Sequence, residues 1–168
     1  QGKFKESAKF LKIANDESMK YKKSDLSLKI KHTEFYRSLE IKKSKNKYLK
    51  NSSNYIFIVG MPRSGSTLLE NILSLNSEVT DMGEVSFLEE SIKEAKGFEE
   101  IYDLYEKKVI NQFKSSTFYT DKSLFNYMYI AIISNFFPKA KIINCIRNPL
   151  DNILSIYKAN FLNQSFSF

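Results

Sequence analysis

The clearest pattern along the chain is a short apolar run followed by helical spacing. The run YIFIV at residues 55–59 lies between a polar stretch and a glycine, which predicts a short buried strand. The next apolar residues recur three and four positions apart and predict a helix over residues 67–75. One apolar face of this helix is expected to comprise Leu68, Leu69, Ile72 and Leu73. A strand, a glycine-containing loop and a helix aim backbone N–H groups at an anion.

A second strand is predicted at residues 141–146, with the sequence KIINCI. The next residues end this strand, because Asn148 can cap a helix and Pro149 can occupy its first turn. The helix that follows has apolar residues at helical spacing, namely Leu150, Ile153, Leu154, Tyr157 and Phe161. The chain therefore contains two strand-loop-helix units.

The segment between these units is less clearly patterned. Residues 85–114 are acidic and helical in character, and residues 117–119 resemble the end of a strand. A helix is predicted over residues 124–137 and is closed by Pro138. Tyr127 and Tyr129 lie in this helix, where aromatic residues are more often core than pocket.

Two strand-loop-helix units separated by another helix predict an α/β fold of the P-loop-like type. We expect a parallel sheet with helices on both faces, in three layers. Ligands of such sheets bind at the carboxyl ends of the strands. The loop at residues 60–67 and Arg147 are therefore expected at the same edge of the sheet.

The N-terminal residues have a different character. Residues 1–48 carry apolar residues at helical offsets and predict two or three amphipathic helices, and residues 45–54 form a polar linker. We therefore expect a helical extension over 1–50, which could end a helical repeat region, and a partial α/β domain over 51–168. Three interpretations of the extension stay open: ordinary solvated helices, a surface for a partner protein, and contact with nucleic acid.

Charge and composition narrow these interpretations. The 168 residues carry a net charge of +7, but residues 1–50 hold 15 Lys and Arg against 6 Asp and Glu, whereas the rest holds 11 against 13. The basic excess is thus N-terminal, and we expect neither nucleic-acid nor membrane binding by the α/β domain.

The single cysteine, Cys145, is expected to pack within its strand, and the single histidine, His32, to have a surface or packing role. With one cysteine and one histidine, the sequence has no disulfide framework and no zinc motif, and any Ser-His or Cys-His pair would have to use His32.

The setting and extent of the chain are also expectations. No apolar run approaches the length of a membrane-spanning helix, and the N-terminal residues are charged, so we expect a cytoplasmic protein. The chain starts at Gln1 and stops at Phe168 directly after a helical segment. We therefore expect a C-terminally truncated piece of a longer protein, which is poorly stable or inactive on its own.

The loop after the first strand departs from the nucleotide-binding template. Read against G-x-x-x-x-G-K-[ST], the segment GMPRSGST supplies Gly60, Gly65 and Thr67. Ser66 stands where the lysine should be, and Arg63 lies three residues earlier. An anion in this loop would thus be held by backbone N–H groups, hydroxyls and one guanidinium.

Three segments together resemble the sulfotransferases of the tetratricopeptide-linked and tyrosylprotein-like type. They are FIVGMPRSGSTLLENIL, then DMGEVSFL, then DKSLFNYMYIAIISNFFPKAKIINCIRNPLDNILSIYKANF. The resemblance covers roughly residues 55–162. It implies a domain that binds 3′-phosphoadenosine 5′-phosphosulfate, needs no metal, and transfers the sulfuryl group to a hydroxyl of an acceptor substrate.

The same resemblance implies the roles of individual residues. The 5′-phosphosulfate would be lined by Arg63, Ser64, Gly65, Ser66, Thr67 and Leu68. Arg147 and Ser155 resemble the pair that binds the 3′-phosphate. Glu84 matches the carboxylate that takes the acceptor's proton, and Lys122 matches the lysine that stabilises charge on the leaving oxygen. Arg63 is the third catalytic candidate.

Two other functions remain open at this point. A nucleotide kinase or other P-loop NTPase would share the loop, although the missing lysine argues against it. A non-catalytic helical interaction module would use the N-terminal helices to bind a partner. The acceptor of a sulfotransferase also stays open between protein tyrosine, a small alcohol and a carbohydrate.

Overall fold

The structure is a computed structural model of the chain that describes residues 2–21, 26–38 and 53–159. It divides into two units, one of residues 35–146 and one of residues 1–34 with 147–168. The predicted boundary between 1–50 and 51–168 lies within residues that the structure does not describe, and it stays a prediction. Among the described residues, no helix combines the length and apolar character that crossing a membrane requires.

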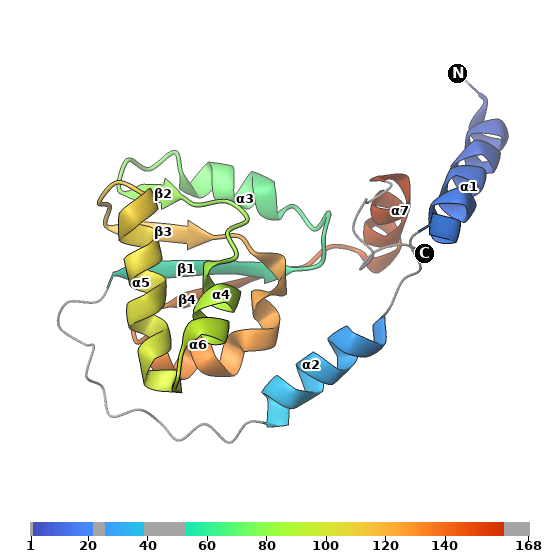
Figure 1. Cartoon of the computed structure of the whole chain (residues 1–168). Coiled ribbons are helices and arrows are strands. Elements are labelled where there is room, and N and C mark those ends of the chain that lie inside the picture. The colour runs from blue at the N-terminus through green and yellow to red at the C-terminus, as the bar shows by residue number, and fades with distance from the viewer. Residues whose placement is uncertain (1, 22–25, 39–52, 160–168) are drawn as a thin grey trace. The chain divides into compact units, whose positions relative to one another are not determined.

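The larger unit is built on a parallel sheet of four strands in the order β2-β3-β1-β4 (Figure 1). The strands are β1 (Asn54–Gly60), β2 (Val79–Asp81), β3 (Phe118–Asp121) and β4 (Lys141–Cys145). β1 pairs with β3 on one side and with β4 on the other, and its last residue, Gly60, pairs with Cys145. The predicted parallel α/β sheet is thereby confirmed, although the short strand β2 had no recognised signal in the sequence.

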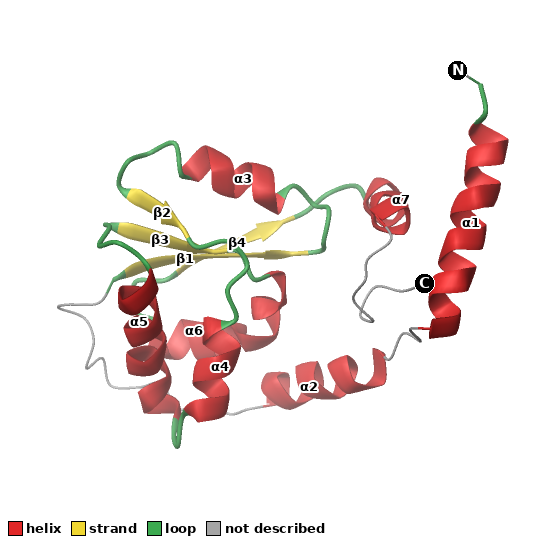
Figure 2. Ribbon diagram, turned by 45° about the horizontal axis from the view of Figure 1, so that its top comes forward, coloured by secondary structure: helices red, strands yellow, loops and turns green. Residues whose placement is uncertain are grey.

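Helices cover both faces of this sheet, as Figure 2 shows from a second direction. The helix α3 (Ser66–Leu73) lies on one face, and the other face is covered by α4 (Phe87–Glu94), α5 (Ile101–Gln112) and α6 (Ile130–Phe136). Two 3₁₀ helices, η1 (Phe98–Glu100) and η2 (Leu124–Tyr129), precede α5 and α6. The helix predicted over 124–137 is therefore a 3₁₀ segment followed by a short α-helix.

The core lies between the sheet and the three helices α4, α5 and α6. Strand alternation turns Tyr55 and Phe57 of β1 to this side, where both are almost completely buried. Aromatic rings meet edge to face here; Tyr55 and Tyr105, for example, have ring centroids 5.0 Å apart. Tyr129 belongs to this core, as expected, whereas Tyr127 is 40% exposed.

The α3 face differs from its prediction. Of the four residues on the predicted apolar face, Leu68 is 66% and Ile72 55% exposed, whereas Leu69 and Leu73 are half-buried. The helix instead buries Ser66 and Glu70, which lie one turn apart. The expected apolar face is wrong for Leu68 and Ile72, because the Thr120 hydroxyl and the Gly83 amide donate to Glu70 and hold its side chain in the buried position.

The second unit contains α1 (Phe4–Tyr21) and α7 (Pro149–Ala159), and α2 (Leu26–Ser38) runs from this unit into the larger one. The side-chain amide of Asn15 donates to the Tyr157 carbonyl at 3.3 Å, so α1 and α7 are hydrogen-bonded. The predicted cap of α7 is confirmed, because Asn148 Oδ1 accepts from the amides of Leu150 and Asp151. The apolar stripe predicted there is largely exposed, and Asn152 and Ile156 are the buried residues of α7.

Some expected features fall on residues or side chains outside the described set. These are most of the polar linker at 45–54, the His32 side chain and Phe161. The predicted N-terminal helices within the described ranges are α1 and α2.

Candidate functional site

The site lies at the carboxyl ends of β1, β2 and β3, where the chain leaves the sheet. Gly60 ends β1 with a φ of 143°, and a Cβ at this position would lie 2.5 Å from the carbonyl oxygen of Cys145. Only glycine fits such a close approach to the neighbouring strand. The loop that follows therefore starts tightly against β4.

The loop itself has an unusual backbone. Arg63 adopts a φ of 65°, a left-handed conformation that costs a non-glycine residue roughly 1–2 kcal/mol. Gly65 also has a positive φ, 99°, and is the N-cap of α3. Strained backbone of this kind concentrates at ligand-binding turns.

The beginning of α3 presents hydrogen-bond donors. The first backbone bond of the helix runs from the Leu69 amide to the Gly65 carbonyl at 3.0 Å. The amides of residues 66–68 precede this bond, and such N-terminal amides have no acceptor inside a helix. They carry the positive end of the helix dipole, which favours an anion.

A buried hydroxyl in the loop also lacks a partner. Ser64 Oγ is buried and makes no hydrogen bond within the described structure. Buried polar atoms are almost always paired, so an orphaned one indicates a missing partner such as a bound ligand. A phosphosulfate oxygen is a suitable acceptor, and the donors of the loop therefore fit the group that the sequence resemblance implies.

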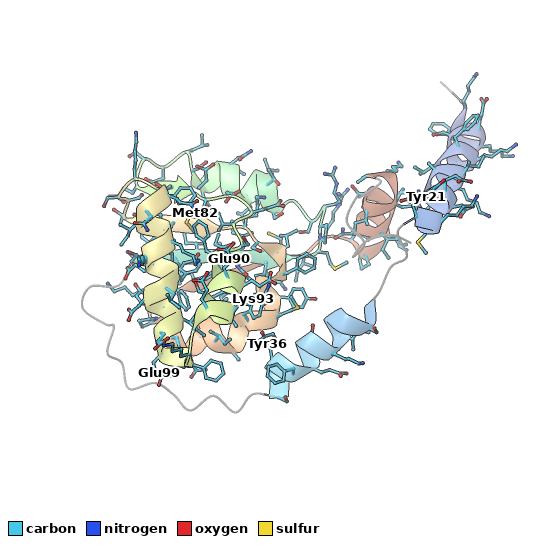
Figure 3. All side chains as sticks on the ribbon, in the orientation of Figure 1. Tyr21, Tyr36, Met82, Glu90, Lys93 and Glu99 are labelled. Atoms are coloured by element: carbon cyan, nitrogen blue, oxygen red, sulfur yellow. The ribbon has the colours of Figure 1, made fainter. Side chains whose placement is uncertain are left out.

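Two of the three predicted catalytic residues, Lys122 and Glu84, lie together at the neighbouring strand ends. Lys122 Nζ donates to Glu84 Oε1 at 2.8 Å, although the residues are 38 positions apart in the sequence. Lys122 follows β3 and Glu84 follows β2; Met82, two residues before Glu84, is labelled in Figure 3. The backbone fixes this approach, since the amide of Lys122 donates to the Gly83 carbonyl at 2.9 Å.

The environments of these two side chains differ sharply. The Lys122 side chain is 7% exposed, whereas that of Glu84 is 70% exposed. A buried ammonium and an accessible carboxylate thus meet at one point. This arrangement suits a lysine that stabilises negative charge and a carboxylate that solvent or a substrate can reach.

A third charged residue, Glu70, joins this pair and was missed by the sequence analysis. Its Oε2 lies 3.8 Å from Lys122 Nζ, and its side chain is 4% exposed. Its Oε1 accepts from the Thr120 hydroxyl at 2.9 Å and from the Gly83 amide at 3.2 Å. In the sequence it is one glutamate of a helix among 19 acidic residues, and no spacing singles it out.

A fourth ionisable group, Asp121, lies on the opposite side of β3. Burial raises the pKa of Asp121 to about 7, and the nearby charge of Glu70 adds to the increase. Its carboxylate accepts from Tyr105 Oη at 2.8 Å, the Ser123 amide at 2.9 Å and Asn126 Nδ2 at 3.0 Å. These bonds fix the turn that begins directly after Lys122.

The remaining predicted site residues have varied surroundings. Within the loop and α3, Ser66 is buried, Ser64 half-buried, and Arg63, Gly65, Thr67 and Leu68 exposed. Arg147 and Ser155 belong to the other unit, where Arg147 is exposed and Ser155 half-buried. Their position at the same edge of the sheet as the loop stays a prediction.

Comparison with known proteins adds to this geometry. The family model described as "Sulfotransferase domain" matches residues 53–167. An uncharacterised protein of Aquifex aeolicus (strain VF5) is 32% identical in an alignment of 136 residues, and the match covers 66% of this chain. The chain spans 18% of the length of that relative.

Proposed function

The chain belongs to the sulfotransferase domain family, and we propose that it transfers a sulfuryl group from 3′-phosphoadenosine 5′-phosphosulfate to an acceptor hydroxyl. One observation carries the proposal. Lys122 and Glu84, to which the sequence resemblance assigns the two catalytic roles, lie 2.8 Å apart beside a strained, donor-rich loop. The unpaired hydroxyl of Ser64 supports the same assignment.

The binding residues would act through directional donors. The amides at the start of α3, the Ser64 hydroxyl and the Arg63 guanidinium would hold the 5′-phosphosulfate. A sulfuryl group carries less charge than a phosphoryl group, so this set can serve without a P-loop lysine. Metal-free binding is part of the proposal. Arg147 and Ser155 would bind the 3′-phosphate, as the resemblance implies.

The donor supplies an activated sulfuryl group bonded to a phosphate oxygen. The acceptor oxygen forms a bond to sulfur while the bond between sulfur and the bridging oxygen breaks, and the bonding electron pair passes to the phosphate. Glu84 takes the proton of the acceptor hydroxyl, and Lys122 donates to the bridging oxygen as negative charge develops there. The products are the sulfated acceptor and 3′-phosphoadenosine 5′-phosphate.

Calorimetry on the full chain tests the binding half of this proposal. 3′-phosphoadenosine 5′-phosphate is expected to bind without added metal, and Arg63→Ala is expected to weaken it about tenfold or more. Lys107→Ala, which removes an exposed charge from α5, is the control and is expected to have no effect. Metal-dependent binding of ATP, with no binding of 3′-phosphoadenosine 5′-phosphate (the bisphosphate), would favour the P-loop NTPase instead.

A second ligand separates the two proposed phosphate sites. Adenosine 5′-monophosphate lacks the 3′-phosphate, so Arg147→Ala is expected to leave its affinity unchanged while lowering that of the bisphosphate. Arg63→Ala is expected to weaken both ligands. Equal losses for both ligands in the Arg147 variant would contradict the assignment of Arg147.

The proposal also covers the N-terminal helices and the location of the protein. A partner protein bound by α1 and α2 remains a proposal, as does a cytoplasmic location. The acceptor class stays open between protein tyrosine, a small alcohol and a carbohydrate.

A further inference from the structure

Glu70 is a buried acidic side chain that lies 3.8 Å from Lys122 Nζ, and the proposed chemistry gives it no role. It lies in α3, directly beyond the phosphosulfate loop, and the residue is 3% exposed. Burying a carboxylate is costly unless it is hydrogen-bonded and paired with a positive charge. Its contacts therefore indicate what the fold gains by placing it there.

The two carboxylate oxygens of Glu70 have different partners. Oε1 accepts from the Thr120 hydroxyl and from the Gly83 amide, and Gly83 directly precedes Glu84. Oε2 lies 3.8 Å from Lys122 Nζ. One side chain thus connects the helix after the loop to Lys122 and to the residue that precedes Glu84.

Lys122 therefore has two carboxylate partners of opposite character. Glu84 is closer, at 2.8 Å, but its side chain is 70% exposed, so water and ligands compete for this contact. Glu70 is farther, at 3.8 Å, but its side chain is 4% exposed. If the buried ammonium of Lys122 kept only Glu84, releasing that contact would leave it uncompensated, which is strongly unfavourable.

We propose that Glu70 is a positioning residue that stays with Lys122 as its fixed countercharge while the contact between Lys122 and Glu84 is exchanged for substrate contacts. Lys122 can then turn to the bridging oxygen of the donor, and Glu84 is free to accept the proton of the acceptor. The bond from Gly83 to Glu70 holds the backbone next to Glu84 during this exchange. This inference rests on the proposed sulfuryl transfer.

Glu70→Gln removes the negative charge of the side chain but keeps its size and shape. The amide oxygen of glutamine can still accept from Thr120 and Gly83, but the negative charge is lost. We expect kcat of the full chain to fall about tenfold or more while KM for the donor stays within about threefold. Glu78→Gln removes an exposed charge from the loop before β2 and is the matched control, with unchanged kinetics.

A double-mutant cycle with Lys122→Met tests whether Glu70 acts through Lys122. Glu70→Gln is expected to lower kcat no further when Lys122 is already replaced, because the residue it positions is absent. A kcat of Glu70→Gln within about twofold of the wild type, or an independent loss on the Lys122→Met background, would overturn the proposal.

Denaturant unfolding of the wild type, Glu70→Gln, Lys122→Met and the double variant gives a measure that does not depend on activity. Removing both charges is expected to destabilise the fold less than Glu70→Gln alone, since the double variant leaves no unpaired buried charge. If Glu70→Gln does not fold, a folded double variant supports the pairing, and failure of both overturns it. A full-length wild-type protein without sulfuryl transfer would refute the proposed function, whereas additive changes in the free energy of unfolding would refute the pairing of Glu70 with Lys122.

Discussion

The two faces of β3 each bury a carboxylate beside Lys122, and they do so by different means. On the core side, Asp121 is surrounded by neutral donors, chiefly Tyr105 and Asn126. On the α3 side, Glu70 is paired with a cation and accepts from Thr120. Strand alternation explains the division, since consecutive residues of β3 point to opposite faces.

This difference separates stability from chemistry within one unit. On the core side, the buried aromatic cluster includes Tyr105, and the hydrogen bonds of Asp121 fix the turn after Lys122. Both side chains are fully buried. The α3 side combines positive φ angles, an unpaired hydroxyl and an exposed catalytic candidate. We therefore expect substitutions on the α3 side to change activity, and substitutions on the core side to change stability.

The largest expected effect is on activity. Glu84→Gln removes the proposed base, so kcat is expected to fall about 10²–10⁴-fold. The unfolding free energy is expected to change little, because the Glu84 side chain is 70% exposed. Steady-state kinetics and denaturant unfolding of the full chain measure the two quantities. Glu89→Gln, which removes another exposed carboxylate at the beginning of α4, is the control; equal activity losses in both variants would argue against a specific role for Glu84.

The next effect is on stability and contrasts the two faces directly. Phe57→Ala deletes a fully buried ring whose centroid lies 5.5 Å from that of the Phe137 ring. This substitution is expected to lower the free energy of unfolding by about 3–5 kcal/mol. Ile72→Ala on α3 is expected to change the unfolding free energy by no more than about 0.5 kcal/mol, since Ile72 is 55% exposed. Chemical denaturation measures both. A large loss at Ile72 would show that the α3 face is buried in the folded protein.

A smaller effect is expected from the protonation of Asp121. Burial raises the pKa of Asp121 to about 7, so the folded chain keeps a proton that the unfolded chain releases near pH 4. The contribution of Asp121 to stability is therefore complete below about pH 4 and declines as the pH rises to about 7. Denaturant unfolding at several pH values is expected to show a flatter profile for Asp121→Asn. An unchanged profile would mean that Asp121 is ionised in the folded protein throughout this range.

The smallest effect concerns one hydrogen bond of the same carboxylate. Tyr105→Phe removes the hydroxyl that donates to Asp121 Oδ2 at 2.8 Å and is expected to cost about 1–2 kcal/mol. The loss is expected to be larger at pH 8 than at pH 5, because an ionised carboxylate accepts stronger hydrogen bonds. Unfolding of both proteins at these two pH values gives the comparison. A loss independent of pH would contradict the titration assigned to Asp121.

The sequence predicted the parts of the fold that depend on local pattern. The runs at 55–59 and 141–146 became β1 and β4, and the loop between β1 and α3 follows from its glycines. The cap at Asn148 was also predictable, because capping needs only neighbouring residues. The three-residue strand β2 was not, since so short a segment carries no periodicity.

The parts that pattern alone missed depend on long-range contacts. Amphipathic spacing favoured Leu68 and Ile72 as the buried face of α3, but the contacts from Thr120 and Gly83 require Glu70 there instead. The approach of Lys122 to Glu84 was expected only through family resemblance. No local signal in the sequence indicates that two residues 38 positions apart will meet.

The strand order also governs how the protein is made. Of the four described strands β1 comes earliest in the sequence, yet its pairing partners, β3 and β4, begin only at Phe118 and Lys141. Until both have left the ribosome, the apolar segment 55–59 keeps at least one open edge, and such edges are prone to pairing with other chains. The emergence of residues 141–145 is thus the step that covers the second edge of β1.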